Sequence, residues 1–192
     1  MKKLKALFLG AVIALAGCAS KGETYTITNN VDLDSVPADM SVYDWIGDQT
    51  GDFQEITFSK ALRLFKEKGS GILYFGYDDC PFCERGVPLL NEAVLETGVT
   101  VYYIDVYGPF QPTAAEYLEL MGYIVELMIE DSSGAKAFFV PWVIGVKNGE
   151  VTASHVSLVP DFVIEDEESQ MNDSQKKELR EIYMDIIRKT AD

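Results

Sequence analysis

The sequence predicts an α/β domain with a mixed central sheet, in which helices join parallel strands and an antiparallel hairpin follows. Between residues 58 and 146, short apolar runs alternate with segments whose apolar residues recur every three or four positions. Such runs are typical of buried strands, and the recurrence is typical of amphipathic helices. Asn148-Gly149 then separates two strand-like runs, as in a tight hairpin turn. Strands joined by helices pair in parallel through right-handed crossovers, so helices should flank the sheet.

The elements can be assigned in order. The first helix should begin near residue 58 with Ser59 as its N-cap and stop at Gly69. The elements expected after it are a strand at 71–77, a helix from about 83 to 97, a strand at 99–107, a helix at about 113–129, strands at 139–146 and 151–156, and a last helix capped by Asp173 or Ser174.

The first 17 residues have the features of a secretory signal: a basic start, an apolar stretch too short to span a bilayer, and small residues at its end. Leu15-Ala16-Gly17-Cys18 resembles a bacterial lipobox, which implies cleavage before Cys18 and a lipid on its sulfur. The alternative is a plain signal peptide cut near Ala16. We expect a lipid-anchored protein on the extracytoplasmic face of the cell membrane, where disulfides persist.

Residues 18–40 are polar and are expected to form a tether, with a short strand at 24–28, before a domain at 41–192. Residues 42–53 are expected to be a flap or edge strand. The net charge is −15, and losing residues 1–17 removes three lysines and no acids, which leaves −18. Such a chain is repelled by nucleic acid, so no nucleic-acid partner is expected.

The chemistry is expected at Cys80-Pro81-Phe82-Cys83. A structural zinc site needs four ligands, whereas the sequence offers this pair and His155, which is far away and expected on a surface or edge strand. No metal is therefore expected. A purely structural disulfide would close too small a loop to gain much chain entropy.

A redox-active dithiol suits the position of the pair, directly after a buried strand and at the start of a helix. The helix N-terminus would stabilise a thiolate at Cys80, which makes Cys80 the nucleophile. Cys83, one turn inside the helix, would be more buried and would resolve the mixed disulfide. Pro81 suits a first helical turn because its missing N–H is not needed there.

Residues 56–189 resemble a thioredoxin fold. The resemblance rests on the strand at 71–77, the Cys80–Cys83 motif, Pro88 five residues later, and the stretch 140–151. It implies that Pro141 is a cis-proline facing the dithiol and that the backbone of Val140 pairs with an extended substrate. Within this superfamily the chain is most similar to extracytoplasmic lipoproteins of Gram-positive bacteria, some of which are labelled bacteriocin transport accessory proteins.

Three features depart from the thioredoxin pattern. Tyr74 replaces the buried aspartate that serves as proton acceptor for the second cysteine, and Asp79 replaces the tryptophan before the first. The extra length falls within residues 108–137. Asp78, Asp79 and Glu84 surround the dithiol, and negative neighbours disfavour a thiolate. A disfavoured dithiol is a stronger reductant, so we expect a disulfide reductase or isomerase.

The sequence therefore favours a membrane-anchored thiol–disulfide oxidoreductase that needs no cofactor and acts on thiols and disulfides of proteins or peptides. Its redox donor stays open. One alternative is a non-enzymatic thioredoxin-fold module that binds a peptide or a secretion partner. Another is metal delivery through the dithiol.

Overall fold

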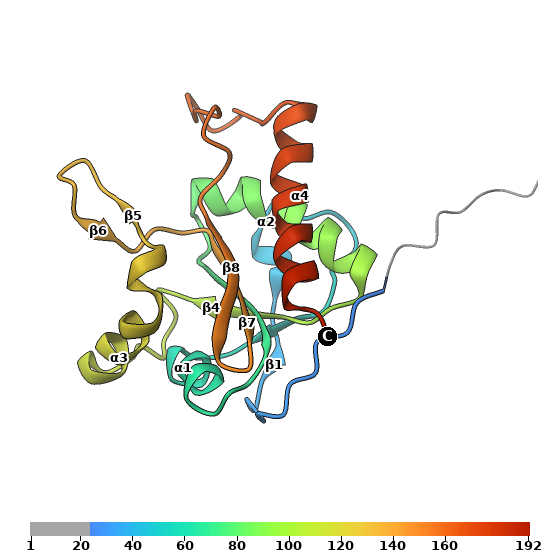
Figure 1. The fold of residues 1–192 in the computed structure, drawn as a ribbon. Coiled ribbons are helices and arrows are strands. Elements are labelled where there is room, and N and C mark those ends of the chain that lie inside the picture. Colours follow the sequence, from blue (N-terminus) through green and yellow to red (C-terminus); the bar gives the residue numbers. More distant parts are fainter. Residues whose placement is uncertain (1–23) are drawn as a thin grey trace, which may run out of the picture.

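The computed structural model describes residues 24–192, which form a central sheet with helices on both faces (Figure 1). The expected signal peptide at 1–17, Cys18 and the first part of the expected tether lie outside the described residues. None of the helices in residues 24–192 has both the length and the apolar character needed to cross a bilayer.

The six-stranded sheet has the order β1-β2-β4-β3-β7-β8. β2 and β3 both run parallel to β4, whereas β7 is antiparallel to β3, β8 to β7, and β1 to β2. This mixed sheet confirms the predicted thioredoxin-like α/β fold. The strands are β1 (Val36–Pro37), β2 (Phe53–Glu55), β3 (Gly71–Gly76), β4 (Val101–Asp105), β7 (Trp142–Lys147) and β8 (Glu150–Val156).

Four α-helices cover the two faces of the sheet (Figure 1). Ile72 and Tyr74 of β3 lie in one buried cluster with residues of α2 and α4, and Leu73 and Phe75 lie in a second with α1 and α3. This division follows from the alternation of side chains along a strand. The helices are α1 (Phe58–Lys66), α2 (Pro81–Thr97), α3 (Ala114–Ile124) and α4 (Asp173–Thr190), with 3-10 turns at Met40–Val42 and Val125–Leu127.

Both predicted helix caps are corrected. Thr57, not Ser59, caps α1 by accepting a hydrogen bond from the backbone N–H of Lys60, and the Ser59 hydroxyl instead donates to Glu116 at 2.8 Å. Asn172 caps α4 in a reciprocal capping box with Gln175, ahead of the expected Asp173 or Ser174. An N-cap residue has an extended rather than a helical backbone. Thr57 and Asn172 meet this condition, and each lies just before the residues at which the sequence pattern predicted the helix to begin.

The hairpin at Asn148-Gly149 is confirmed. Both residues have positive φ, 54° and 80°, as a type I′ turn requires. The helix expected at 113–129 is shorter, because α3 ends at Ile124. A small hairpin that the sequence analysis did not predict follows it, formed by β5 (Ile129–Glu130) and β6 (Lys136–Ala137).

The segment expected as a flap or edge strand at 42–53 is largely a loop that covers the sheet. Tyr43 is 1% exposed and Ile46 is also buried, and they belong to the same core cluster as the two cysteines of the motif. Within this segment, only Phe53 belongs to a strand, as the first residue of β2.

Residues 24–33, which we call the strap, are packed on the domain, so the tether prediction does not hold for residues 24–40. The backbone N–H of Tyr25 donates to the carbonyl of Thr97, at the end of α2. The Thr28 N–H and hydroxyl both donate to the carboxylate of Asp192. Val31 and Leu33 are buried. The strap is extended, but the strand expected at 24–28 does not form.

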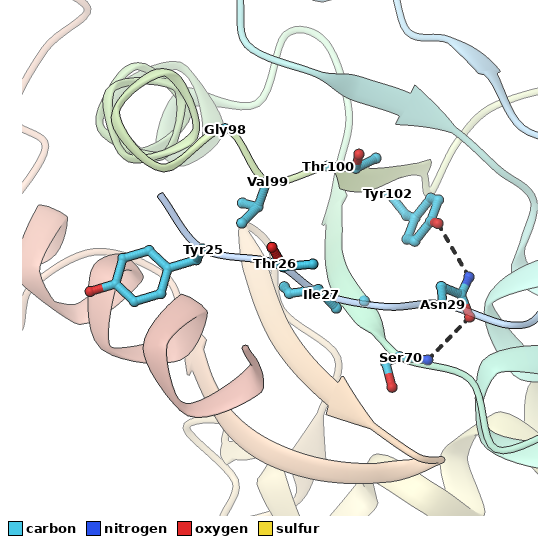
Figure 2. Close-up of a pocket in the computed structure, with 10 residues that line it drawn as sticks. Tyr25, Thr26, Ile27, Asn29, Ser70, Gly98, Val99, Thr100 and Tyr102 are labelled. Carbon is cyan, nitrogen blue, oxygen red and sulfur yellow. Dashed lines mark hydrogen bonds between the residues drawn. The ribbon is translucent and has the colours of Figure 1, made fainter. Parts of the chain in front are cut away.

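The strap is also bonded to the rest of the domain through the inward-facing side chain of Asn29 (Figure 2). Its carboxamide donates to the hydroxyl of Tyr102 at 3.2 Å and accepts from the backbone N–H of Ser70 at 3.2 Å. Tyr25, Thr26 and Ile27 line the same small pocket, of ≈ 270 Å³. The strap therefore belongs to the folded domain.

The strap can be tested by Leu33→Ala, which should lower the free energy of unfolding by about 2–5 kcal/mol because it removes a buried aliphatic side chain. Leu33 is 3% exposed, whereas Val36, three residues on, is 55% exposed. Val36→Ala is therefore the control and should change stability by less than about 0.5 kcal/mol. Urea unfolding measures both, and equal effects would restore the tether interpretation.

Candidate redox site

The two motif cysteines form a disulfide at the start of α2, with their Cα atoms 5.1 Å apart. β3 ends at Gly76, and a three-residue turn leads to Cys80, which is the N-cap of α2. The Cys80 sulfur accepts a hydrogen bond from the backbone N–H of Cys83 at 3.1 Å. Pro81 occupies the first turn, as expected. An N–H group at a helix N-terminus thus already points at the sulfur that the sequence analysis assigns as nucleophile.

The expected difference in exposure between the cysteines is small in this disulfide form, because Cys80 is 2% exposed and Cys83 is fully buried. The residues between them lie at the surface, and Phe82 is 42% exposed. Asp79 has φ 56°, in the left-handed region, which aspartate tolerates better than most residues. The turn at 77–79 thus connects β3 with Cys80 at the start of α2.

Val140-Pro141 is a cis peptide bond, as the resemblance implied. In the register of β3 and β7, Phe75 pairs with Trp142, so Pro141 comes next, beside the end of β3 that leads to Cys80. Pro141 also lies against α2, because a Cβ added at Gly86 would be 3.3 Å from its ring. Val140 is half-buried and packs against the cluster that holds both cysteines.

Three tyrosines occupy the region where the thioredoxin pattern has a buried aspartate. The hydroxyl of Tyr74 donates to that of Tyr43 at 3.3 Å, and Tyr43 donates to Tyr103 at 3.4 Å. Burial raises the pKa of all three phenols. The phenols therefore stay neutral and form a hydrogen-bonded group rather than an anionic proton acceptor.

Glu84 follows Cys83 directly and is the acidic residue in the first turn of α2. One of its carboxylate oxygens accepts a hydrogen bond from the backbone N–H of Asp44 at 3.0 Å. Burial raises the pKa of Glu84, and the like charges of Asp44 and Asp79 raise it further. The site thus combines a helix N-terminus, which favours a thiolate, with acidic groups that oppose it.

Arg85 is a residue whose role the sequence analysis missed. Its side chain is 4% exposed, and its guanidinium lies 5.0 Å from the centre of the Trp45 ring. It donates to the carbonyl oxygens of Pro81 at 2.6 Å, Ser169 at 2.6 Å, Glu167 at 2.8 Å and Asp166 at 3.2 Å. It therefore fastens the loop at 166–169 to the first turn of α2.

His155 lies on β8, an edge strand of the sheet, as expected, and its ring is partly buried there. It pairs with Val143 in the sheet and packs edge-on against Tyr183. Its Nε2 atom is buried without a hydrogen-bond partner in residues 24–192. Among these residues, no three or more His, Cys, Asp or Glu side chains are grouped so that they could hold a metal ion.

Comparison with known proteins gives a likeness to solved structures only. No protein-family model matches the chain, and no match is found among curated proteins. Among solved structures, the chain is similar to thioredoxin from Aeropyrum pernix, with 24% identity, a TM-score of 0.36, and coverage of 55% of this chain and 75% of that one. The thioredoxin-like fold follows from the mixed sheet, with β2 and β3 parallel to β4, the antiparallel β7–β8 hairpin, and helices on both faces.

The burial of His155 has a pH consequence. Desolvation lowers its pKa from the ordinary 6.5, so the unfolded chain binds its proton at a higher pH than the folded chain does. The free energy of unfolding should therefore fall as pH drops from about 6.5 to the folded pKa, and His155→Gln should remove this part of the dependence.

Because His155 is the only histidine, its titration can be followed directly by NMR. Urea unfolding at several pH values gives the stability. A folded-state pKa above 6.5, or an unchanged pH dependence in the variant, would contradict this account of the site.

Proposed function

We propose that the protein is a thiol–disulfide oxidoreductase that uses the Cys80–Cys83 pair. The observation that carries the proposal is the disulfide at the N-terminus of α2, where the backbone N–H of Cys83 donates to the Cys80 sulfur. A group that stabilises negative charge on one of two paired cysteines supports an attacking thiolate there.

In the proposed reaction, the Cys80 thiolate attacks one sulfur of a substrate disulfide. The substrate S–S bond breaks, a mixed disulfide forms, and one substrate thiolate leaves and takes up a proton. Cys83 then loses its proton and attacks the Cys80 sulfur, which releases the second substrate thiol and forms the Cys80–Cys83 disulfide. Two electrons pass to the substrate, and a thiol donor of the cell must return the pair to the dithiol.

Val140 and Pro141 are proposed to hold the substrate. The ladder between β7 and β3 begins at Trp142, so Val140 lies outside it, at the edge that leads to the dithiol. An extended substrate could pair with the backbone of Val140 in the manner of an added strand. Phe82 would lie beside such a substrate because it is exposed between the two cysteines.

The proposed reaction gives the two cysteines different roles, and trapping of the mixed disulfide distinguishes them. Cys83→Ser should accumulate a mixed disulfide through Cys80 when the reduced protein meets a disulfide-containing peptide. Cys80→Ser should accumulate none, because the N–H at the start of α2 that favours a thiolate points at the sulfur of Cys80, whereas Cys83 lies one turn inside the helix. Mass spectrometry of the alkylated products identifies the linked cysteine.

Trapping through Cys83 in the Cys80→Ser variant would reverse the two roles. The alternative function, a binding or secretion accessory module, predicts that both variants keep full activity in the cell.

We propose that the direction favours reduction of the substrate. Asp78, Asp79 and Glu84 are negative, and they disfavour a thiolate at Cys80 against the effect of the helix. The reduced form is then less stable, and its potential should lie well below the roughly −120 mV of dedicated disulfide donors.

Asp79→Asn should make the potential less negative, by about 30 mV for each unit by which the Cys80 pKa falls. Asparagine suits this test because it tolerates the positive φ of residue 79. Glu150→Gln, at the hairpin turn between β7 and β8, is the control and should leave the potential unchanged. A wild-type potential near −120 mV, measured against a glutathione buffer, would contradict the preferred direction.

We further propose that a lipid on Cys18 holds the protein at the extracytoplasmic face of the membrane, as in the Gram-positive lipoproteins that the sequence resembles. Cys18 precedes Thr24 by six residues, which span at most about 20 Å. The strap is bonded to the C-terminal end of α2, and Cys80 caps the other end, about 25 Å away along the 17-residue helix. This arrangement would direct the dithiol away from the bilayer.

The anchor is tested with Cys18→Ser. The variant should leave the membrane fraction or keep its uncleaved signal, because no thiol is left to carry the lipid. Fractionation and intact mass decide this, and a variant that fractionates and migrates like the wild type would refute the anchor.

A further inference from the structure

A groove lies against the first turn of α2, and we call it the acidic groove. Its volume is ≈ 640 Å³, within the usual size of ligand pockets, and it is lined by the loop at 164–168, by Asp44 and Trp45, and by residues at the start of α2. Asp79 and Pro81, which flank Cys80 in the chain, are part of its lining. A polypeptide in this groove would therefore lie beside the dithiol.

The groove concentrates negative charge well beyond the average of the chain. Seven of its eleven lining residues are acidic, compared with 31 acidic residues in the whole chain of 192. Within residues 24–192, none of the seven takes part in an ion pair. Arg85 is the one cation of the lining, and its guanidinium is already bonded to backbone carbonyls.

Gathering these carboxylates costs free energy that a bound cation would recover. The raised pKa of Glu84 reflects this, since burial and the charges of Asp44 and Asp79 all disfavour its carboxylate. The loop acids 165, 167 and 168 line the groove and are exposed, so a flexible cationic side chain can reach them. Attraction of this kind mainly raises the rate of encounter.

The walls of the groove are fixed to one another. Arg85 bonds the loop carbonyls of Asp166 and Glu167 on one side, and Glu84 holds the backbone N–H of Asp44 on the other. Trp45 is 39% exposed, with Arg85 already over its ring. The accessible part of this aromatic side chain offers a further contact for a lysine or arginine side chain.

We propose that the acidic groove binds a lysine- or arginine-rich segment of the polypeptide whose disulfide Cys80 attacks, so that cationic proteins or peptides are the preferred substrates. The proposal rests on the thiol–disulfide exchange proposed above. Anionic disulfide substrates would be repelled by the same carboxylates.

The test uses the reduced full-length chain in single turnovers, so that no external donor is needed. Three peptides with one internal disulfide are compared, identical except for four flanking positions that are all Lys, all Gln or all Glu. The second-order rate constant should fall in that order, with about a tenfold difference between Lys and Gln at low salt. The difference should vanish at 1 M salt, where the screening length is about 3 Å.

Two triple variants, each of which removes three negative charges, test whether the preference for the Lys peptide comes from the groove. Glu165→Gln with Glu167→Gln and Glu168→Gln should bring the Lys-to-Gln ratio towards one. Glu126→Gln with Glu150→Gln and Glu178→Gln removes the same charge from exposed positions outside the groove and should leave the ratio as in the wild type.

The outcomes separate this inference from the proposed function. Equal rates for the three peptides would overturn the groove proposal and leave the oxidoreductase intact. Failure to reduce any of them would overturn the oxidoreductase as well. Equal loss of preference in both triple variants would assign the effect to net charge and would also overturn the groove proposal, as would a preference that survives the groove triple.

Discussion

The environment of the dithiol depends on the buried guanidinium of Arg85. Burying a cation is costly unless hydrogen bonds replace its hydration, and four backbone carbonyls do so here. Three of these carbonyls come from the loop at 166–169, more than 80 residues away in sequence, and the fourth belongs to Pro81 beside Cys80. The first turn of α2, the acidic loop and Trp45 thus form one unit around a single side chain. That unit is also what gives the acidic groove its walls.

Much of the fold could be predicted because the spacing of apolar residues along the chain indicates which side chains are buried. β3 and α2 were assigned to within about two residues, since β3 is buried along its whole length and α2 has a regular apolar pattern. The strap was missed because its inward positions 25, 27, 31 and 33 are apolar but the alternation is interrupted by Asn29. Asn29 faces inward as well, where Tyr102 and Ser70 satisfy its carboxamide (Figure 2). A polar side chain with buried partners cannot be told from a loop residue in the sequence.

The site was predictable where its parts are adjacent in sequence and unpredictable where they are not. The Cys80–Cys83 pair follows a strand and starts a helix, which is visible in the sequence. The tyrosine group joins residues 43, 74 and 103, from three separate segments, and only the packing of the sheet brings their hydroxyls together. Arg85 was similarly hidden, because its acceptors are backbone carbonyls and any loop sequence can supply them. The acidic loop at 165–168 was hidden in the same way, because nothing in the sequence connects it with α2.

Neutral and negatively charged side chains lie on different sides of the dithiol. On the inner side, three neutral phenols share hydrogen bonds, and their burial keeps them from ionising. On the outer side, Asp79, Glu84 and the loop carboxylates face the groove. A thiolate at Cys80 would therefore be stabilised by the helix from within and opposed by negative charge from the surface. A cationic substrate segment in the groove would weaken that opposition while it is bound. Under this proposal, substrate binding and activation of Cys80 are linked. The carboxylates that attract the cationic substrate also disfavour the Cys80 thiolate until the substrate is bound.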